Sequence, residues 1–321
     1  MYDAIVIQSL RIEPGSKQVG YIKAAETPSS TIQMPIIVLN GADKGPVLSI
    51  TAGIHGCEYT GIAALGRLYR NLSPKDLKGA VIAAQIVNVS SFENRTPYVC
   101  PIDNLNIGGL FPGRKDGTVG HQLVYTAFTE IVSRGNYYIE LHGGDMGEEH
   151  IDVAYFSNTG DKDLDKKSEM LARNCLAEWV WQSHSAGPGS STAAAAGKGI
   201  PKITYEIGDL ARLEERRIKQ CHDGILNVMK HLGMLDGQVA ESKARLLDQR
   251  IMVRAQRGGL FLPKVKQGDI VSKEQLLGEV LDLSGTAVEE LLSPAKGVVL
   301  QVFPTSAVHS GAALVGVATF K

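Results

Sequence analysis

The chain contains two histidine–acid pairs, and each pair lies in a run of glycines at the end of an apolar segment. His55 and Glu58 stand three residues apart within residues 53–61, and His142 and Asp145 repeat this spacing. Imidazole nitrogens and carboxylate oxygens are ligands that zinc prefers. In a chain with eight histidines about one such pair is expected by chance, so the surrounding elements must support any metal site.

The elements around the first pair predict a strand-to-helix turn. Residues 46–52 are apolar and rich in β-formers, which is typical of a buried strand. From residue 62 to residue 69 apolar side chains recur at helical spacing. Glycines between the two elements permit a sharp bend of the backbone. Residues 137–145 are a second apolar strand that ends in glycines, and this strand delivers His142 in the same way.

Further strands and helices alternate along the first three quarters of the chain. We expect strands over residues 35–40, 80–89, 151–157 and 202–208, and helices over residues 118–133, 161–181 and 209–231. This alternation predicts an α/β fold with a mostly parallel sheet flanked by helices. Ligands bind at the carboxyl ends of such strands, where His55, His142 and Glu206 fall. The long irregular region of residues 90–120 follows a buried strand, and we expect it to form a wall of the site.

The last quarter of the chain has a different pattern of apolar residues and glycines. A charged stretch at residues 241–245 suggests a linker, and we predict two domains, residues 1–245 and 246–321. The second has short apolar pieces between glycine turns and a partial internal repeat, which predicts a small all-β barrel or sandwich. Such modules can carry a modified lysine, but Lys296 lacks the acidic and methionine neighbours of carrier sites, so we favour a structural role.

The overall composition excludes several classes of partner. The formal net charge of −1 gives no general attraction to nucleic acid or to anionic membranes. No apolar run approaches membrane-spanning length, and residues 1–7 lack the features of a secretory signal. The four cysteines show no CxxC spacing and predict reduced thiols in a cytoplasmic protein. We expect a small-molecule partner, and the sequence leaves open whether the chain forms a homo-oligomer.

The chemistry depends on a set of four residues. His55, Glu58 and His142 supply two imidazoles and a carboxylate, the three-ligand pattern of catalytic zinc with a fourth position left for water. Cys57 lies inside the motif, but its neighbours suit zinc better. Such a site activates water and polarises a carbonyl, and it needs a carboxylate to move the proton. Glu206 is the best-placed candidate, and the alternative is that it caps or pairs with a surface lysine.

Three segments, in this order, resemble a known family. Residues 53–58, 140–142 and 199–208 are similar to motifs of the succinylglutamate desuccinylase and aspartoacylase family, within the zinc carboxypeptidase-like superfamily. The resemblance extends from about residue 35 onward, and the carboxyl-terminal part matches the tail of bacterial members. It implies zinc on His55, Glu58 and His142, with Glu206 as general base and acid. It also implies hydrolysis of an N-acyl amide, and members with this tail include deacetylases of N-acetylated diamino acids in ectoine breakdown.

The chain departs from the family pattern where the substrate should bind. Tyr98 stands where the family usually has an arginine, and glycines at residues 108–109 replace an Asn-Arg pair that holds the substrate carboxylate and the oxyanion. A bidentate arginine clamp is not replaced by glycine, and losing an oxyanion donor typically costs about 3–4 kcal/mol of transition-state stabilisation. Arg95 and Arg114 lie nearby and are candidates to substitute from shifted positions.

A third departure concerns the residue two positions before the last ligand. The family usually has an aspartate there, and this chain has Glu140, which keeps the charge and lengthens the reach. Two hypotheses follow from these departures. The first is a zinc-dependent hydrolase of a small N-acylated amino acid or amine. The second is a metal-binding homologue that binds a ligand and is catalytically weak or inactive.

Overall fold

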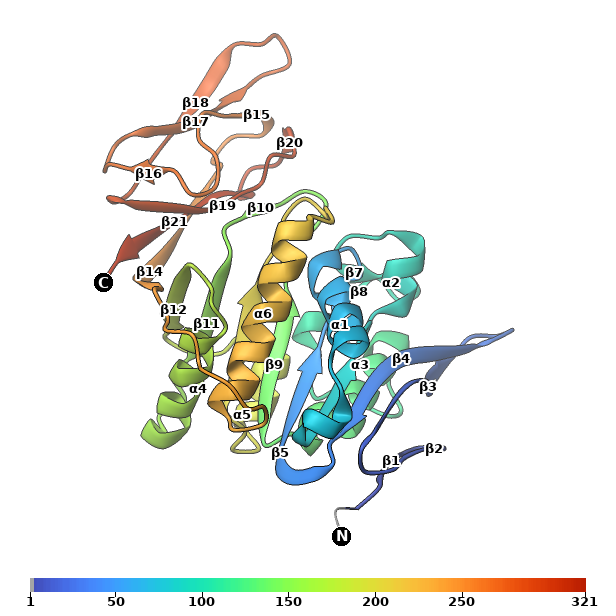
Figure 1. The fold of residues 1–321 in the computed structure, drawn as a ribbon. Coiled ribbons are helices and arrows are strands. Elements are labelled where there is room, and N and C mark those ends of the chain that lie inside the picture. Colours follow the sequence, from blue (N-terminus) through green and yellow to red (C-terminus); the bar gives the residue numbers. More distant parts are fainter. Residues whose placement is uncertain (1–2) are drawn as a thin grey trace.

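The chain folds into a large mixed sheet with helices on both faces and an all-β carboxyl-terminal part (Figure 1). This computed structural model describes residues 3–321, so Met1 and Tyr2 of the segment considered above for a secretory signal lie outside the description. Within residues 3–321, no helix combines the length and the apolar character needed to cross a membrane. The fold is therefore of the expected mixed α/β class.

Four neighbouring strands form the parallel centre of the sheet. In spatial order they are β6 (Lys78–Ala84), β5 (Asp43–Thr51), β9 (Tyr137–His142) and β13 (Lys202–Glu206). Each adjacent pair among them runs parallel. Strand β6 is buried from its second residue to its last, as its near-continuous apolar sequence predicts. The carboxyl ends of all these strands therefore meet at one edge.

Antiparallel pairs flank this centre on both sides. The flanking strands are β4 (Thr31–Asn40) and β3 (Ser16–Glu26) next to β6, and β11 (Val153–Ser157) and β12 (Trp179–Ser183) next to β13. Strand β11 pairs antiparallel with β13 and parallel with β12. Two short hairpins, β1 (Ile5–Ile7) with β2 (Leu10–Ile12) and β7 (Val99–Cys100) with β8 (Leu105–Asn106), lie apart from this sheet. The expected mostly parallel arrangement holds at the centre, and the sheet as a whole is mixed.

The helices cover both faces of the sheet and form two apolar cores. The first core includes side chains of α1 (Tyr59–Asn71), α4 (Lys162–Asn174) and α6 (Glu215–His231). The second includes side chains of α3 (Val119–Glu130) and α5 (Ser191–Ala196). Because side chains alternate along a strand, Ile139 of β9 lies in the first core and Tyr138 lies in the second.

Two predicted helices were too long. The helix predicted over residues 161–181 ends at Asn174, and β12 occupies the end of that range. Leu176 has a positive φ of 60°, which a helix does not tolerate, and aromatic and β-branched residues follow it. The helix predicted over residues 209–231 begins only at Glu215, because Leu210 and Ala211 also have positive φ.

The strand predicted over residues 80–89 was also too long. Strand β6 ends at Ala84, and the short helix α2 (Val89–Asn94) begins after Asn88. The side chain of Asn88 accepts a hydrogen bond from the backbone N–H of Ser91 and caps this helix. The rest of residues 90–120 is mostly turns, with the 3-10 turn Ile107–Gly109 among them.

The carboxyl-terminal part is continuous with the large sheet. Strand β14 (Arg245–Arg254) begins where a linker was expected, and it pairs with β12 on one side and with β21 (Ala313–Phe320) on the other. The sheet then continues through β19 (Gly297–Val302), which pairs with β10 (Glu149–His150) and β16 (Ile270–Val271). A second, four-stranded antiparallel sheet contains β18 (Ala287–Leu292), β17 (Leu276–Leu281), β15 (Gly259–Pro263) and β20 (Ala307–Val308). Side chains of both layers, Phe261 and Val317 among them, share one buried core.

Close packing of α6 on the end of α4 makes one glycine substitution informative. A Cβ atom on Gly224 would lie 2.1 Å from the carbonyl oxygen of Cys175. In an open helix Gly→Ala stabilises by about 1 kcal/mol, but overpacking here costs about 1–3 kcal/mol. We expect Gly224→Ala to lower the urea midpoint and Gly66→Ala, where the nearest atom is 3.4 Å from a Cβ, to raise it. Equal stabilisation by both variants would contradict this packing.

Candidate metal centre and active site

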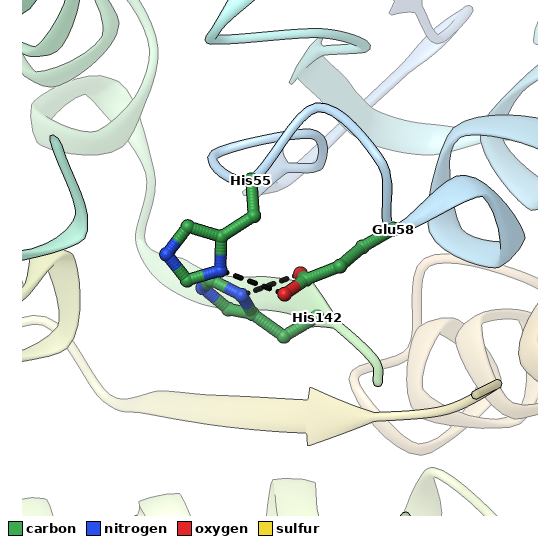
Figure 2. Close-up of side chains that lie close together, drawn as sticks. All are labelled: His55, Glu58 and His142. Carbon is green, nitrogen blue, oxygen red and sulfur yellow. Dashed lines mark hydrogen bonds and ion pairs between the residues drawn. The ribbon is translucent and has the colours of Figure 1, made fainter. Parts of the chain in front are cut away.

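Three side chains from two neighbouring strand ends converge on one point. His55 lies in the turn between β5 and α1, Glu58 is the residue before α1, and His142 is the last residue of β9. Figure 2 shows that the three side chains point toward one another. Their donor atoms all lie within 4.8 Å of one another. The structure thus brings together the three residues predicted to bind zinc.

The turn that carries His55 and Glu58 requires glycine at two positions. Gly53 has a φ of 62°, in the left-handed region that other residues rarely adopt. A Cβ atom on Gly56 would lie 2.2 Å from the backbone nitrogen of Phe92. The glycines that mark the motif in the sequence therefore allow the tight turn and the close approach of helix α2.

The carboxylate of Glu58 is shared between the two imidazoles. Nδ1 of His55 lies 2.7 Å from Oε1 of Glu58, and Nδ1 of His142 lies 2.7 Å from Oε2. The backbone N–H of Gly143 donates to Oε2 over 3.3 Å. Burial alone would raise the pKa of Glu58, but the charges of His142 and His55 outweigh it and hold this pKa below its ordinary value. Two imidazole nitrogens and a carboxylate oxygen facing one point are a donor set that suits zinc.

The other nitrogen of each imidazole also has an acceptor. Nε2 of His142 lies 3.4 Å from Oε1 of Glu140, and Nε2 of His55 lies 3.1 Å from Oδ1 of Asn106. Histidines that bind metal usually donate their second ring nitrogen to a carboxylate or carbonyl oxygen, which fixes the ring. This arrangement supports the metal assignment through atoms other than the ligands themselves.

Glu140 is longer than the aspartate usual in the family, and it keeps a contact with His142. The hydroxyl of Thr204 donates to Oε2 of Glu140 over 2.7 Å, and the hydroxyl of Ser191 donates to Oε1. Glu140 is 4% exposed and is therefore held from two sides inside the protein. The substitution keeps the contact with the histidine.

Glu206 lies beside the proposed ligands, as predicted. It is the last residue of β13 and pairs in register with His142 on β9. The hydroxyl of Tyr155 donates to its Oε1 over 3.4 Å. Burial raises the pKa of Glu206, His142 opposes this change, and the neighbouring carboxylates add to it. A raised pKa suits a carboxyl group that must accept and then release a proton near neutral pH.

These residues line an acidic pocket of about 460 Å³, which is called the metal pocket below. Its lining residues are His55, Glu58, Tyr98, Asn106, Gly108, Gly109, Glu140, His142, Gly143, Glu148, Tyr155, Ser190 and Glu206. Among the described residues, no arginine or lysine belongs to this lining. Of the predicted substrate-binding residues, Tyr98 lies in the wall, whereas Arg95 and Arg114 are exposed and outside it.

Tyr98 connects the pocket to the carboxyl-terminal part of the chain. Its ring meets the ring of His55 edge-on, with centroids 5.5 Å apart. Its hydroxyl donates to Oε2 of Glu148 over 3.1 Å, and the side-chain amide of Gln301 on β19 donates to Oε1 over 2.5 Å. The backbone N–H of Tyr98 donates to Asp145 over 2.9 Å. Asp145, the acid of the second histidine–acid pair, therefore fixes this loop instead of facing the metal site.

The cysteines stand apart from the site. Cys57 is fully buried, burial raises the pKa of its thiol, and it is not among the pocket-lining residues. All four cysteines lie within residues 3–321, where they are buried and free. The interpretation of Cys57 as a neighbour of the ligands rather than a ligand agrees with this arrangement.

Comparison with known proteins identifies the family. A family model described as the succinylglutamate desuccinylase/aspartoacylase catalytic domain matches residues 44–232, more than half of the chain. The chain therefore belongs to the succinylglutamate desuccinylase/aspartoacylase family. The matched range contains every residue described above as part of the metal centre.

Relatives match nearly the whole chain. N-alpha-acetyl-L-2,4-diaminobutyric acid deacetylase of Halomonas elongata is 26% identical over 309 residues, which cover 92% of this chain and 89% of the relative. The product-bound structure of the ectoine utilization protein EutE (DoeB) from Ruegeria pomeroyi has a TM-score of 0.88 at 23% identity, covering 94% of this chain and 95% of that one. A succinylglutamate desuccinylase/aspartoacylase structure from Rhodobacter sphaeroides has a TM-score of 0.87 at 25% identity, covering 95% and 96%. The carboxyl-terminal β part is thus included in these matches.

Asn106 provides a test of the metal centre that leaves the ligands intact. We expect Asn106→Ala to weaken zinc binding by about 10- to 100-fold, because the acceptor for His55 is lost. Asn106→Asp keeps an acceptor at this position and should recover most of the affinity. His55→Ala is the reference and should lose zinc. Competition titration with a chromogenic chelator measures all three, and wild-type affinity in Asn106→Ala would contradict the role of this residue.

The raised pKa of Glu148 makes the stability of the metal-free protein depend on pH. Burial, together with the charge of Glu58, raises the pKa of Glu148 from 4.5 to about 7. The folded state therefore binds this proton more tightly than the unfolded state, and stability falls as pH rises from about 4.5 to about 7. The full effect is at most roughly 3 kcal/mol.

We expect Glu148→Gln to remove this part of the pH slope. Denaturant titrations between pH 4.5 and 8 in the presence of a chelator measure it. The exposed Glu93→Gln is the matched control and should keep the wild-type slope. Identical slopes for the two variants would contradict the raised pKa.

Proposed function

We propose that this chain is a zinc-dependent hydrolase that cleaves the N-acyl amide bond of a small N-acylated amino acid or amine. The observation that carries the proposal is the convergence of His55, Glu58 and His142 beside Glu206, at the ends of neighbouring strands. The deacetylase activity in the name of the Halomonas elongata relative supports an acyl-amide substrate. Four buried free thiols agree with the proposed cytoplasmic location.

Each residue of the site has a distinct task in this proposal. Zinc bound by His55, Glu58 and His142 would polarise the acyl carbonyl and lower the pKa of the attacking water. Glu206 would accept the proton of that water and pass it to the departing nitrogen, so that the amine leaves neutral and the carboxylic acid forms. Tyr155 orients Glu206 through its hydroxyl, which lies 3.4 Å from the carboxylate.

Of the three residues predicted to contact substrate, Tyr98 is retained because it lines the pocket. Its hydroxyl is bonded to Glu148, so its ring edge beside His55 is the surface that a substrate would meet. Arg95 and Arg114 would need a different arrangement of the loop to reach the metal.

A second candidate function rests on one specific observation. Gly108 and Gly109 face the pocket, and among the described residues no cationic side chain lines it to replace the Asn-Arg pair of the family. A homologue that binds a ligand at the metal without turning it over fits this observation. A panel of N-acetyl, N-succinyl and N-formyl amino acids and amines, tested against the zinc-loaded protein, separates the two functions.

Substitution of Glu206 is the direct test of the proposed mechanism. We expect Glu206→Gln to lower kcat by about 10²- to 10⁴-fold, because the proton acceptor is lost. The variant should bind one equivalent of zinc, since the three proposed ligands are unchanged. Glu241→Gln, at an exposed position far along the chain, is the control and should retain wild-type kcat. Near wild-type turnover in Glu206→Gln would exclude Glu206 as the base.

A further inference from the structure

A second pocket adjoins the metal pocket along the same face of the sheet. This side pocket has a volume of about 280 Å³ and shares Glu140, Tyr155 and Ser190 with the metal pocket. Strand β13 connects the two, since side chains of alternate residues point to one face. Glu206 lines the metal pocket, Thr204 and Lys202 line the side pocket, and all three lie on that face.

Lys202 is a buried cation with too few partners. It is 0% exposed, and its Nζ donates over 3.2 Å to the backbone oxygen of Ser157. Within residues 3–321 it has no other side-chain hydrogen bond and no ion pair. A lysine ammonium has three donors, so two of them lack acceptors. Burying a charge without a counter-ion is costly, and burial lowers the pKa of Lys202. The charge of Asp165 opposes this change only in part, and Asp165 is bonded to Thr159.

Two further groups in the side pocket also lack partners. The hydroxyl oxygen of Ser157 is buried and has no hydrogen-bond partner among the described residues. Arg250 of β14 is exposed at the same pocket and forms no ion pair within the described part of the chain. The one carboxylate in the lining, Glu140, is bonded to Ser191 and Thr204. The lining of the side pocket thus contains a buried amine, a surface cation and a buried hydroxyl without a partner among the described residues.

We propose that the side pocket binds a carboxylate of the substrate, with Lys202 as its buried partner and Arg250 at the entrance. This inference rests on the proposed function and names the class of substrate: an N-acyl amide that carries a carboxylate several bonds from the scissile carbonyl. The α-carbons of Lys202 and Glu206 are four residues apart on one strand, a span of about 13 Å. A carboxylate directly beside the amide would therefore be too near the metal to reach Lys202.

The carboxylate can belong to either half of the substrate. A dicarboxylic acyl group carries it on the acyl side, and an amino acid with a long side chain carries it on the amine side. The metal pocket itself is acidic and has no cation in its lining, which disfavours a carboxylate there and favours one in the side pocket. The shared chemistry is a distal carboxylate, and the substrate panel distinguishes its source.

Binding of small dicarboxylates tests the side pocket without turnover. Calorimetric titration of the zinc-loaded protein with succinate, glutarate and adipate is compared with titration of butyrate, valerate and hexanoate, which keep the chain lengths and lack the second carboxylate. We expect at least one dicarboxylate to bind roughly 10- to 100-fold more tightly than its matched monocarboxylate, because a charge-assisted hydrogen bond is gained. Lys202→Met should abolish this ratio.

Two other variants complete the experiment. Arg250 is exposed. Arg250→Met should lower the ratio of the two affinities by about 3- to 10-fold, a modest effect typical of exposed charges. Lys198→Met, an exposed lysine near α5, is the control and should leave the ratio unchanged. If Lys202→Met does not fold, the Arg250→Met result decides. Equal affinity of wild type for dicarboxylates and their matched monocarboxylates, or an unchanged ratio in both variants, would overturn the proposal.

Kinetics separates this inference from the proposed function. N-succinyl and N-glutaryl amines carry the carboxylate on the acyl side, and N-acetylglutamate and N-acetylaminoadipate carry it on the amine side. Lys202→Met should lower kcat/KM by roughly 10- to 100-fold for one of these sets and spare N-acetylated amines without a carboxylate. If wild type discriminates dicarboxylates through Lys202 but cleaves no amide, the proposed function fails and the anion site stands. If amides are cleaved and Lys202→Met has no effect, the anion site fails and the proposed function stands.

Discussion

The buried carboxylate of Glu58 holds the two strand ends of the active site together. Its Oε1 lies 2.7 Å from Nδ1 of His55, and its Oε2 lies 2.7 Å from Nδ1 of His142. The backbone N–H of Gly143 donates to Oε2 as well. An ionised carboxylate that is only 6% exposed is costly unless such partners satisfy it. The arrangement exists because β5 and β9 are parallel neighbours in a fixed register. A slip of one residue would turn His142 to the opposite face and leave Glu58 with His55 as its one histidine partner.

The carboxyl-terminal strands extend this constraint beyond the helical part of the chain. Gln301 of β19 bonds to Glu148, Glu148 bonds to Tyr98, and the ring of Tyr98 lies against His55. Arg250 of β14 lines the side pocket. Because β14 pairs with β12 in the same large sheet, the strands that carry these side chains are joined to the sheet of the candidate metal centre. The all-β part therefore supplies Arg250 to the wall of the side pocket, and its Gln301 bonds to Glu148 in the wall of the metal pocket.

Local patterns, together with the family resemblance, predicted that the proposed ligands and base lie at neighbouring strand ends, and the structure brings these residues together. His55 and His142 each follow an apolar strand and directly precede a glycine, and Glu206 ends an apolar strand two residues before Gly208. The carboxyl ends of parallel strands meet at one edge. Gln301 and Arg250 were missed because their contacts join residues far apart along the chain, and no local pattern signals them. Asn106 was missed for a similar reason, although its place directly before the glycine-rich turn of residues 107–109 was a usable signal. Helix ends were misplaced where a positive φ, as at Leu176, interrupts an otherwise periodic segment.

The replacement of the family's cationic groups is easier to understand as a relocation of charge than as a simple loss. Glycines at residues 108–109 and a tyrosine at residue 98 leave the metal pocket acidic, and a lysine and an arginine appear in the adjoining pocket. Lys202 is the more informative of the two, since it is fully buried on the strand that ends in Glu206. Burial disfavours the charged form of Lys202, and in our proposal an incoming carboxylate offsets that cost. In the proposed hydrolase, binding energy gained at such a distance from the scissile bond would hold the amide against Glu206, so that discrimination and catalysis would be coupled through one strand.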